Sequence, residues 1–450
     1  MRAGKRLTRV FGTSGIRGRV GEDVTAETAL SVGRALAADG YDRVVVGRDP
    51  RDSGRMLQSA VVAGLTEGGT DVVDLGQAAT PTVARSVARH NGDAGVSITA
   101  SHNPAPDNGL KLWSPSGQAF DTQQRNRIAD RIREENYAFE AWDGIGETTT
   151  DEHADRAHVA AIREAVAGPL ACSVVVDIGT GAGGVSADAL AALGCDVQTL
   201  NAQPDGSFPA RPSEPTADNC EALCATVAAT DADLGIAHDG DADRMMAVDE
   251  QGRFVSGDVL LALLAQRSAA AGERVAAPVD TSLLVDDALA PHDVTVTRTR
   301  VGDVYVAEAA TADDIAFGGE PSGAWIWPDE TLCPDGPLAA AKLAALVNDE
   351  GSLGELVDGI DTYPIRRESI EVENNESVMR AVKTLASERY NANDIETLDG
   401  VRLSFSDGWI LVRASGTQPL VRLTAEARSE ETSDELLSEA QALVSTAISE

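Results

Sequence analysis

Short apolar runs alternate with longer amphipathic stretches along the first third of the chain. The apolar runs predict buried strands at Arg43–Asp49, Asp71–Gly76 and Ala94–Thr99. The amphipathic stretches predict helices at Ala26–Ala38, Met56–Glu67 and Thr80–His90. Because strands that alternate with helices form parallel sheets covered by those helices, this region is expected to be an α/β domain with a largely parallel sheet.

The same alternation restarts twice after a polar stretch at residues 143–153, which is interpreted as a linker. Further strands are expected at Ser173–Asp177, Cys195–Leu200, Asp233–His238, Val275–Val279, Val294–Thr297 and Ile315–Gly318. In each of the three segments a strand leads into a compact polar loop, at residues 99–108, 239–244 and 318–323. This pattern indicates a weak threefold repeat of one α/β unit, with the three loops meeting at one cleft.

The C-terminal part of the chain has a different pattern, with strands expected at Tyr363–Glu373, Val401–Phe405, Trp409–Arg413 and Leu420–Ala425. The predicted fold class is therefore α/β: three related α/β domains with mixed, largely parallel sheets, plus a smaller C-terminal α+β domain around a central cleft. The predicted domains are residues 1–145, 153–251, 252–358 and 363–450. Several domains are expected because 450 residues are too many for a single hydrophobic core.

The charge balance narrows the possible partners. Seventy-two acidic residues face 37 basic ones, which gives a formal net charge of −35. Such a surface repels nucleic acid and anionic membranes, so neither is an expected partner. It also repels a phosphorylated ligand, unless salt at ~1 M shortens the screening length to ~3 Å. Because the chain has only four lysines (Lys5, Lys111, Lys342 and Lys383), we expect adaptation to a salt-rich cytoplasm, with an ordinary acidic enzyme as the alternative.

Three further observations favour a cytoplasmic protein. No apolar run approaches the ~20 residues that a membrane helix needs. The first ten residues carry basic side chains but no apolar stretch of export-signal length. The five cysteines are odd in number and form no disulfide framework, which indicates a reducing compartment. A monomer or a small homo-oligomer is expected.

Three carboxylates lie in the segment DGDADR, at Asp239, Asp241 and Asp243. In an extended loop these alternate positions point to the same side, where they repel one another unless a cation lies between them. Oxygen ligands favour Mg²⁺ or Ca²⁺. The spacing therefore favours a metal site, with a solvated acidic turn as the alternative. Arg244 follows directly and is expected to orient the site or to contact a phosphate.

Ser101 follows a predicted strand in the segment TASHNP, next to His102. A serine at a strand end can act as a nucleophile or as a phosphate carrier, although Ser, His and Asn also make ordinary turns. The absence of a G-x-S-x-G pattern argues against a hydrolase. Lys111 lies a few residues further on, and a lysine can change its protonation when desolvated, which an arginine cannot.

Two loops rich in glycine and hydroxyl groups are suited to phosphate. RASGT contains Arg413, Ser415, Gly416 and Thr417. A guanidinium, two hydroxyls and exposed backbone N–H groups suit phosphate binding, with a simple Ser-Gly turn as the alternative. The second loop, FGTSGIRG at residues 11–18, contains Arg17.

In their order and spacing these motifs resemble the α-D-phosphohexomutase family, which includes phosphoglucomutase, phosphomannomutase and phosphoglucosamine mutase. The matching segments are FGTSGIRG (11–18), TASHNP (99–104), DNGLK (107–111), DGDADR (239–244), GEPSG (319–323) and RASGTQP (413–419). The family fold is three related α/β domains plus a smaller C-terminal domain around a central cleft, which agrees with the predicted segments.

The resemblance implies a phosphohexose mutase, which interconverts hexose 1-phosphate and hexose 6-phosphate through a phosphoserine and a 1,6-bisphosphate. Ser101 would carry the phosphate, and its phosphoryl oxygen would hold Mg²⁺ together with Asp239, Asp241 and Asp243. Hexose 1,6-bisphosphate is implied as an activator. The remaining implied site residues are His102, Lys111 and Arg17 in catalysis, Arg244, Gly302, Glu320 and Ser322 in substrate binding, and Arg413, Ser415, Gly416 and Thr417 around the non-reacting phosphate.

Two features point to one branch of the family. The RxSGTxP form of the phosphate loop and the segment VGDVYV at residues 301–306 are similar to phosphoglucosamine mutases. Glucosamine phosphate is therefore the expected substrate, with glucose and mannose phosphates as alternatives. The sugar loop departs from the family pattern at Ala324, where a histidine often stands, and this places one sugar contact in question.

Other classes of function make different predictions. DIGTGAGG at residues 177–184 resembles the turn of a dinucleotide or methyl-donor site, but Leu200 and Asn201 stand where an acidic residue is required. The segment is therefore interpreted as a tight strand-to-helix turn. A phosphatase would release inorganic phosphate, and a non-catalytic sugar-phosphate sensor would not need the intact Ser101 and aspartate set.

Overall fold

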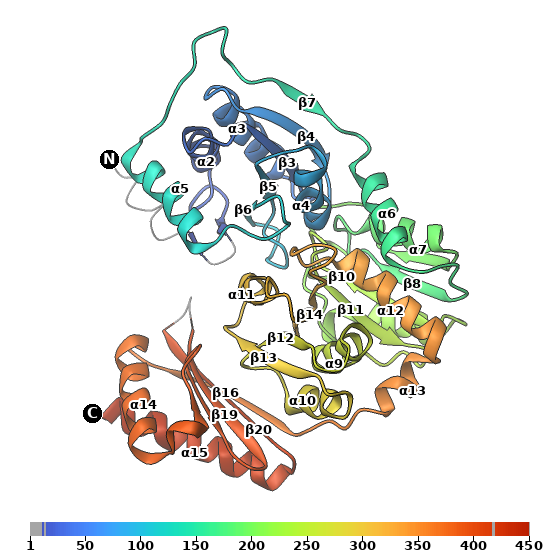
Figure 1. Cartoon of the computed structure of the whole chain (residues 1–450), viewed down its shortest axis with the longest axis vertical. Coiled ribbons are helices and arrows are strands. Elements are labelled where there is room, and N and C mark those ends of the chain that lie inside the picture. The colour runs from blue at the N-terminus through green and yellow to red at the C-terminus, as the bar shows by residue number, and fades with distance from the viewer. Residues whose placement is uncertain (1–10, 13–14, 416–418, 450) are drawn as a thin grey trace.

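Four β-sheets with their covering helices follow one another in the structure, a computed structural model that describes residues 11–12, 15–415 and 419–449. Figure 1 shows them as an arc that begins with the N-terminal sheet at the top and ends with the C-terminal sheet at the bottom. None of the helices in the described part of the chain combines the length and the apolar character that crossing a bilayer would require.

The first sheet contains seven strands in the order β1-β2-β6-β5-β3-β4-β7. Its elements are β1 (Phe11–Gly12), β2 (Gly15–Arg19), α2 (Ala26–Ala38), β3 (Arg43–Arg48), α3 (Gly54–Thr66), β4 (Asp71–Gln77), α4 (Thr80–Arg89), β5 (Ala94–Ile98), β6 (Asp107–Trp113), α5 (Thr122–Glu134) and β7 (Thr148–Thr150). Strand β3 pairs in parallel with β4 and β5, whereas β6 is antiparallel to β5 and β2.

The predicted linker contains one strand of this sheet. Strand β7 pairs in parallel with β4 at the sheet edge, although residues 143–153 carry no apolar run. All three side chains of β7 are exposed, so hydrogen bonding to β4 holds the strand without burial. A pattern search based on buried positions therefore finds no strand in this segment.

Two smaller sheets follow, in the orders β11-β10-β8-β9 and β13-β12-β14-β15. The domain built on β8–β11 contains the elements α6 (Ala154–Ala165), β8 (Ser173–Asp177), α7 (Gly184–Leu193), β9 (Asp196–Leu200), a 3-10 turn (Asp218–Cys220), α8 (Glu221–Ala228), β10 (Leu234–His238) and β11 (Met245–Asp249). The domain built on β12–β15 contains the elements α9 (Gly257–Ser268), β12 (Arg274–Pro278), α10 (Leu283–Leu289), a 3-10 turn (Ala290–His292), β13 (Thr295–Thr299), α11 (Asp303–Ala309), β14 (Ile315–Glu320), β15 (Ala324–Ile326), α12 (Gly336–Glu350) and α13 (Leu353–Asp358).

The three polar loops connect equivalent strands. Residues 99–106 join β5 to β6, residues 239–244 join β10 to β11, and residues 321–323 join β14 to β15. In each sheet the strand before the loop has a parallel neighbour, and the strand after it is antiparallel. The repeat is thus one strand–loop–strand unit used three times, with each loop at the carboxyl end of a parallel strand, where sites form in α/β sheets.

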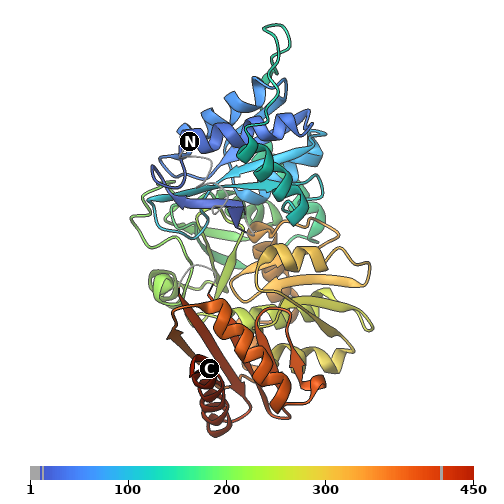
Figure 2. The same cartoon turned by 90° about the vertical axis from the view of Figure 1, so that its left-hand side faces the viewer.

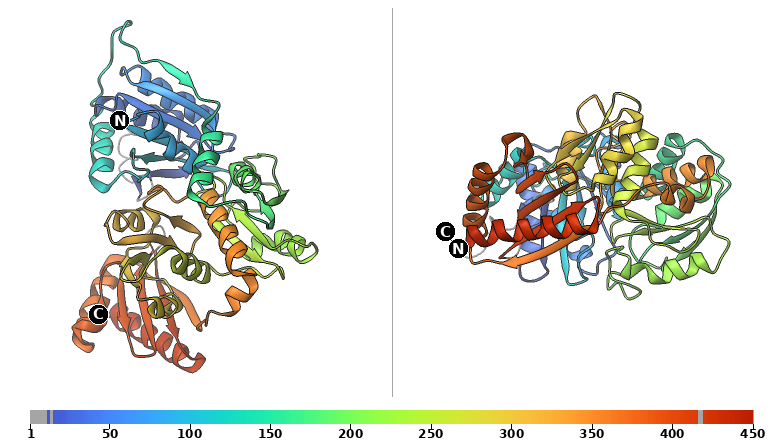
Figure 3. Two further views of the ribbon diagram at one scale, coloured as in Figure 1. Left: turned by 45° about the vertical axis from the view of Figure 1, so that its right-hand side comes forward. Right: turned by 90° about the horizontal axis from the view of Figure 1, so that it is seen from below.

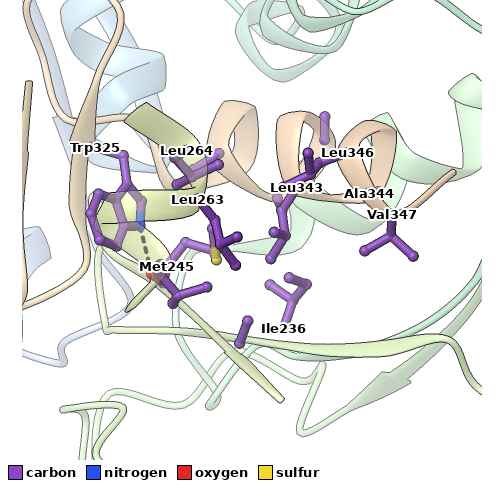
Figure 4. Packing of buried hydrophobic residues seen from close by; sticks show 14 of the residues in the cluster. Ile236, Met245, Leu263, Leu264, Trp325, Leu343, Ala344, Leu346 and Val347 are labelled. Atoms are coloured by element: carbon purple, nitrogen blue, oxygen red, sulfur yellow. Dashed lines mark hydrogen bonds between the residues drawn. The ribbon is translucent and has the colours of Figure 1, made fainter. Parts of the chain in front are cut away.

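The second and third sheets share one hydrophobic core. Helix α12 packs against α7 beside the second sheet and also against α9 beside the third. Figure 4 shows Leu343 of α12, Leu263 of α9 and Ile236 of β10 in one packed group. The indole N–H of Trp325 on β15 donates to the carbonyl oxygen of Met245 on β11 at 2.8 Å. Side chains from both sides of residue 252 therefore bury apolar surface together.

The C-terminal sheet is antiparallel throughout, in the order β16-β20-β19-β18-β17. Its elements are β16 (Ile365–Glu371), α14 (Asn375–Arg389), a 3-10 turn (Ala392–Asp394), β17 (Ile395–Glu396), β18 (Val401–Ser404), β19 (Gly408–Ala414), β20 (Leu420–Ala427) and α15 (Glu430–Ser449). Figures 2 and 3 show this domain at the end of the arc, beside the third sheet. The predicted fold class is confirmed.

Asp335 joins helices from three segments of the chain at a buried point. Its Oδ1 accepts the N–H of Leu338 at the start of α12. Its Oδ2 accepts hydrogen bonds from Arg85 of α4 at 2.7 Å and from His158 of α6 at 3.0 Å. Burial alone would raise the pKa of Asp335, but His158 and Arg85 outweigh it and hold that pKa below its usual range. The ion pair therefore stabilises the junction.

The substitution Asp335→Asn tests this junction. Asparagine can still cap α12, but it leaves Arg85 without its anion, so the free energy of unfolding at pH 7 should fall by about 3 kcal/mol. Because the folded pKa is depressed, the stabilisation is present above the unfolded pKa of about 3.9 and is lost as the pH falls towards the folded value. The difference between wild type and variant in circular-dichroism melts should therefore shrink below about pH 4.

The matched control is Asp329→Asn, which changes an exposed carboxylate a few residues away. This control variant should have the melting curve of the wild type both at pH 7 and below about pH 4. A difference between wild type and Asp335→Asn that stays constant with pH would contradict the assigned ion pair.

Candidate active site

Ser101 is held in a constrained turn after β5. Its φ of +51° lies in the left-handed region, which serine adopts only when its surroundings impose it. Its N–H donates to Thr99 Oγ1 at 2.8 Å, and its hydroxyl donates to Asp239 Oδ2 at 2.6 Å. His102 Nδ1 lies 3.4 Å from the same hydroxyl oxygen. The hydroxyl of the first domain is therefore fixed against a carboxylate of the second.

Arg51 holds the whole Ser101 loop in place. Its guanidinium is buried and pairs with Asp49 at 3.0 Å, and the Phe208 ring lies 4.9 Å from it. The other guanidinium N–H groups donate to the carbonyl oxygens of Ser101, Asn103, Pro104 and Asp107. Sequence reasoning missed Arg51, because its place in the polar segment RDPRD after β3 looks like an ordinary exposed turn.

Asp239, Asp241 and Asp243 lie together in the loop between β10 and β11. One carboxylate oxygen from each lies within 4.8 Å of the others, and all three residues are buried. Burial, together with Asp241 and Asp243, raises the pKa of Asp239 well above its usual value. Burial would also raise the pKa of Asp241, but Lys111 and the Thr80 hydroxyl outweigh it and hold that pKa below the usual range.

Two elements of the first domain reach across to this acidic loop. The Lys111 ammonium on β6 donates to Asp241 Oδ2 at 3.0 Å and also to Asp243. Burial alone would lower the pKa of Lys111, but Asp241 and Asp243 raise it above its ordinary value, so the ammonium keeps its proton. The hydroxyl of Thr80, at the start of α4, donates to the same Asp241 oxygen at 2.7 Å.

The three carboxylates fit a divalent cation. Among the described residues, Asp241 Oδ1 is buried and has no hydrogen-bond partner. Hard, anionic oxygen donors are the ligands that Mg²⁺ prefers. A cation held by Asp239, Asp241 and Asp243 would give this oxygen a partner and would offset the repulsion that raises the pKa of Asp239.

A cavity of about 320 Å³ opens beside Ser101 and extends to the third domain. Asp239 and Asp241 are buried and are not among the described residues that line it. Ala324, at the position of the expected histidine, is part of the lining. The predicted site residues that line the cavity are Arg17, Ser101, His102, Lys111, Asp243, Arg244, Gly302, Glu320 and Ser322. The expected convergence of the three loops is therefore seen in the structure.

Positive charge gathers on the Ser101 side of the cavity. Arg17 on β2 donates from Nη1 to Asn103 Oδ1 at 3.2 Å. The backbone N–H of Arg244 donates to Asp239 Oδ1 at 3.3 Å, and its guanidinium lies 3.5 Å from the Glu214 carboxylate. Burial, followed by the charges of Arg244 and Arg17, lowers the pKa of His102 to about 3, so this imidazole is neutral at pH 7.

The third-domain side of the cavity is formed by Glu320 and its two donors. Oε1 accepts the N–H of Gly302 at 2.7 Å, and Oε2 accepts the hydroxyl of Ser322 at 3.2 Å. Gly302 has a φ of +131°, which a side chain would make costly. Burial and then Asp303 raise the pKa of Glu320 to about 7. A carboxyl with this pKa can both donate hydrogen bonds to and accept hydrogen bonds from the hydroxyl groups of a neutral ligand.

The described part of the predicted phosphate loop lies at the end of β19, and neither Arg413 nor Ser415 is among the described residues that line the cavity. Arg413 pairs there with Asp399 at 3.2 Å, and Ser415 follows at the end of the strand. Gly416 and Thr417 lie outside the described residues. Among the described residues of this domain, Arg367 on β16 lines the cavity. Sequence reasoning missed Arg367, as it also missed the lining residues Asp258 and Asp280, because no motif marks them.

The segments that match one protein family cover nearly the whole chain. The four domains of the phosphoglucomutase/phosphomannomutase family match in order: alpha/beta/alpha domain I at residues 8–138, domain II at 151–252, domain III at 256–363 and the C-terminal domain at 369–442.

Several curated relatives are similar over their full length. A probable phosphoglucosamine mutase of Methanopyrus kandleri is 47% identical over 441 residues, which cover 96% of this chain and 97% of the relative. A probable phosphoglucosamine mutase of Methanosarcina acetivorans is 46% identical over 445 residues, which cover 98% and 100%.

Solved structures share the fold. A phosphoglucomutase/phosphomannomutase family protein from Burkholderia thailandensis superimposes with a TM-score of 0.87 at 27% identity, over 98% of this chain and 97% of that one. A putative phosphomannomutase from Thermus thermophilus gives a TM-score of 0.80 at 26% identity, over 97% and 98%.

Titration calorimetry with MgCl₂ in 2 M KCl tests the acidic loop apart from any turnover. We expect one bound ion per chain in the wild type, and at least about tenfold weaker binding in Asp241→Asn, because the site loses one of its anionic ligands. The matched control is Asp231→Asn, an exposed carboxylate before β10, which should bind as the wild type does. Equal affinity in all three proteins would show that the loop holds no ion.

Proposed function

Because the chain belongs to the phosphoglucomutase/phosphomannomutase family, we propose that it acts as a phosphohexose mutase through a phosphoserine at Ser101. The observation that carries this proposal is the 2.6 Å hydrogen bond from the Ser101 hydroxyl to Asp239, made beside a cavity lined by Arg17, Lys111 and Arg244. A buried serine hydroxyl next to a cation site and several fixed positive charges is suited to carrying a phosphoryl group.

The proposed cycle has two phosphoryl transfers. Phosphorylated Ser101 gives its phosphoryl group to the free hydroxyl of a hexose monophosphate, and the P–O bond to Ser101 breaks as the bond to the sugar forms. The sugar hydroxyl loses its proton in this step, and the freed Ser101 oxygen gains one. The resulting 1,6-bisphosphate reorients in the cavity and returns its other phosphoryl group to Ser101. The products are the isomeric monophosphate and phosphorylated Ser101, so the cycle consumes no phosphate.

We assign the proton and charge handling to three residues around Ser101. His102 is neutral and 3.4 Å from the Ser101 oxygen, so it can accept a proton there. Lys111 keeps its proton against Asp241 and Asp243, so we assign it to holding charge and to donating a proton. Arg17 would support the transferring phosphoryl group. Mg²⁺ held by Asp239, Asp241 and Asp243, and by a phosphoryl oxygen on Ser101, would neutralise charge on that group.

The sugar and its second phosphate are assigned to the far side of the cavity. Arg244, Gly302, Glu320 and Ser322 would bind the hexose, and Arg413, Ser415, Gly416 and Thr417 would hold the non-reacting phosphate. The contacts of Glu320 with Gly302 and Ser322 support this division, because they fix the carboxylate at the lining.

We propose the domain boundaries 1–145, 153–251, 252–358 and 363–450, a cytoplasmic location, and a monomer or small homo-oligomer.

The proposed substrate is glucosamine phosphate, with hexose 1,6-bisphosphate as activator. The similarity to probable phosphoglucosamine mutases at 41–47% identity supports this choice. Glucose and mannose phosphates are the second candidates, because discrimination between such sugars rests on one or two hydrogen bonds and Ala324 supplies none from its side chain. The phosphomutase class does not depend on which of these sugars is preferred.

The test compares glucosamine, glucose and mannose 1-phosphates by kcat/KM, with Mg²⁺, a trace of hexose 1,6-bisphosphate and 2 M KCl. We expect the highest value for glucosamine 1-phosphate and no net release of inorganic phosphate. Ser101→Ala should lower kcat by at least about 10⁴-fold while sugar-phosphate binding persists, because the phosphate carrier is gone. Turnover that survives in Ser101→Ala rules out the phosphoserine route, and release of inorganic phosphate would identify a phosphatase.

We also propose that the enzyme is adapted to a salt-rich cytoplasm. The net charge of −35 and the near-absence of lysine support this. Concentrated salt screens both the mutual repulsion of surface carboxylates and their repulsion of a sugar phosphate.

Activity and melting temperature measured from 0.1 to 3 M KCl test this adaptation. Both should rise with salt, and KM should fall at least about threefold as the screening length drops from about 10 Å to about 3 Å at 1 M. If activity is highest without added salt and is lost in molar KCl, the proposed salt adaptation is wrong.

A further inference from the structure

The C-terminal domain is attached to the third domain at a buried anchor. The Glu426 carboxylate on β20 is fully buried and accepts hydrogen bonds from the Leu283 N–H at 2.8 Å and from the Trp409 indole at 2.6 Å. It also accepts the hydroxyl of Ser282, at the start of α10. Apolar packing of Trp409 against Val279 continues this contact. The anchor fixes the C-terminal sheet on the third domain.

A second polar contact lies next to this apolar packing, against which Val301 also packs, and it includes Arg413. Oδ2 of Asp399 accepts the backbone N–H of Val301 at 3.1 Å and the Arg413 Nη1 at 3.2 Å. Next to it, Arg300 Nε donates to the carbonyl oxygen of Leu398 at 3.2 Å. One carboxylate oxygen therefore touches both the third domain and the residue proposed to hold the non-reacting phosphate.

Val301 connects this contact to the sugar side of the cavity. The next residue, Gly302, donates its N–H to Glu320 at 2.7 Å, and both Val301 and Gly302 line the cavity. A short path of hydrogen bonds and one peptide unit thus runs from Arg413 through Asp399 to Glu320. The distance between the two ends of a hexose phosphate is fixed, so the guanidinium and the sugar loop must keep a matching separation.

We infer that Asp399 is a positioning residue that sets Arg413 at the correct distance from Gly302 and Glu320 on the sugar side of the cavity. This inference rests on the proposed function and adds a residue that the family motifs quoted above do not contain. A guanidinium on a long side chain has many rotamers, and a fixed anion reduces them before the ligand arrives. Asp399 engages the guanidinium at Nη1, and arginine has four further N–H donors for a phosphate.

The central test is Asp399→Asn in the full-length enzyme. Asparagine keeps an oxygen for the Val301 N–H but carries no charge, so it cannot form the ion pair with the Arg413 guanidinium. We expect KM for hexose 1-phosphate to rise about tenfold with kcat within about twofold, since the lost interaction acts equally on bound substrate and transition state. The melting temperature should stay within about 2 °C of the wild type, because the Glu426 anchor remains.

Two controls separate positioning from simple structural support. Glu371→Gln changes an exposed carboxylate on β16 of the same sheet and should leave KM, kcat and melting unchanged. Glu426→Gln should lower the melting temperature without reproducing the selective rise in KM. If Asp399→Asn lowers the melting temperature and kcat while KM stays constant, Asp399 is structural and the inference fails.

A double-mutant cycle with Arg413→Ala tests whether Asp399 acts through Arg413. If it does, adding Asp399→Asn to Arg413→Ala should raise KM by less than about twofold more, whereas independent effects would multiply. Multiplying effects overturn the inference.

Direct titration of glucose 1,6-bisphosphate distinguishes the inference from the proposed function. If the wild type binds this ligand but isomerises no hexose phosphate, the proposed function fails, and the dissociation constants of the same variants still test Asp399. If the wild type does not bind it, Arg413 has no sugar phosphate to position and both fail.

Discussion

The mutual repulsion of Asp239, Asp241 and Asp243 is the constraint on which the arrangement of the first two domains depends. Three buried carboxylates within 4.8 Å of one another need compensating positive charge or hydrogen-bond donors. The first domain supplies these through Lys111 and Thr80, and the Ser101 hydroxyl adds a third donor. The contact that balances the charge is therefore also the contact that brings the serine to the acidic loop.

Local sequence signals were sufficient where capping residues or an apolar run mark the element in the sequence. Helix α2 begins and ends where predicted, because Thr25 and Thr28 form a capping box and the apolar positions have helical spacing. Strand β8 also has the predicted bounds, since its valines are buried in the sheet. The phosphohexomutase motifs likewise identified several of the residues that line the cavity from the first three domains, because each motif is a short contiguous segment, but they did not mark Asp258 or Asp280.

Sequence reasoning failed where a residue acts through distant partners. Arg51 bonds carbonyl oxygens about fifty residues further along the chain, and Asp399 contacts Val301 nearly a hundred residues earlier. In both cases one polar side chain satisfies backbone groups of another segment, and no local pattern encodes that pairing. Strand β7 was missed for a related reason, since among the described strands it pairs with β4 alone.

The shared core around α12 sets how the molecule can be divided. Helix α12 follows the third sheet in the chain, yet it covers α7 of the second, and Trp325 bonds across to Met245. A fragment ending near residue 252 would leave the apolar face of α7 in water, and a fragment starting there would carry an uncovered α12. The second and third repeats are therefore expected to unfold together, although the family comparison matches them as two separate domains.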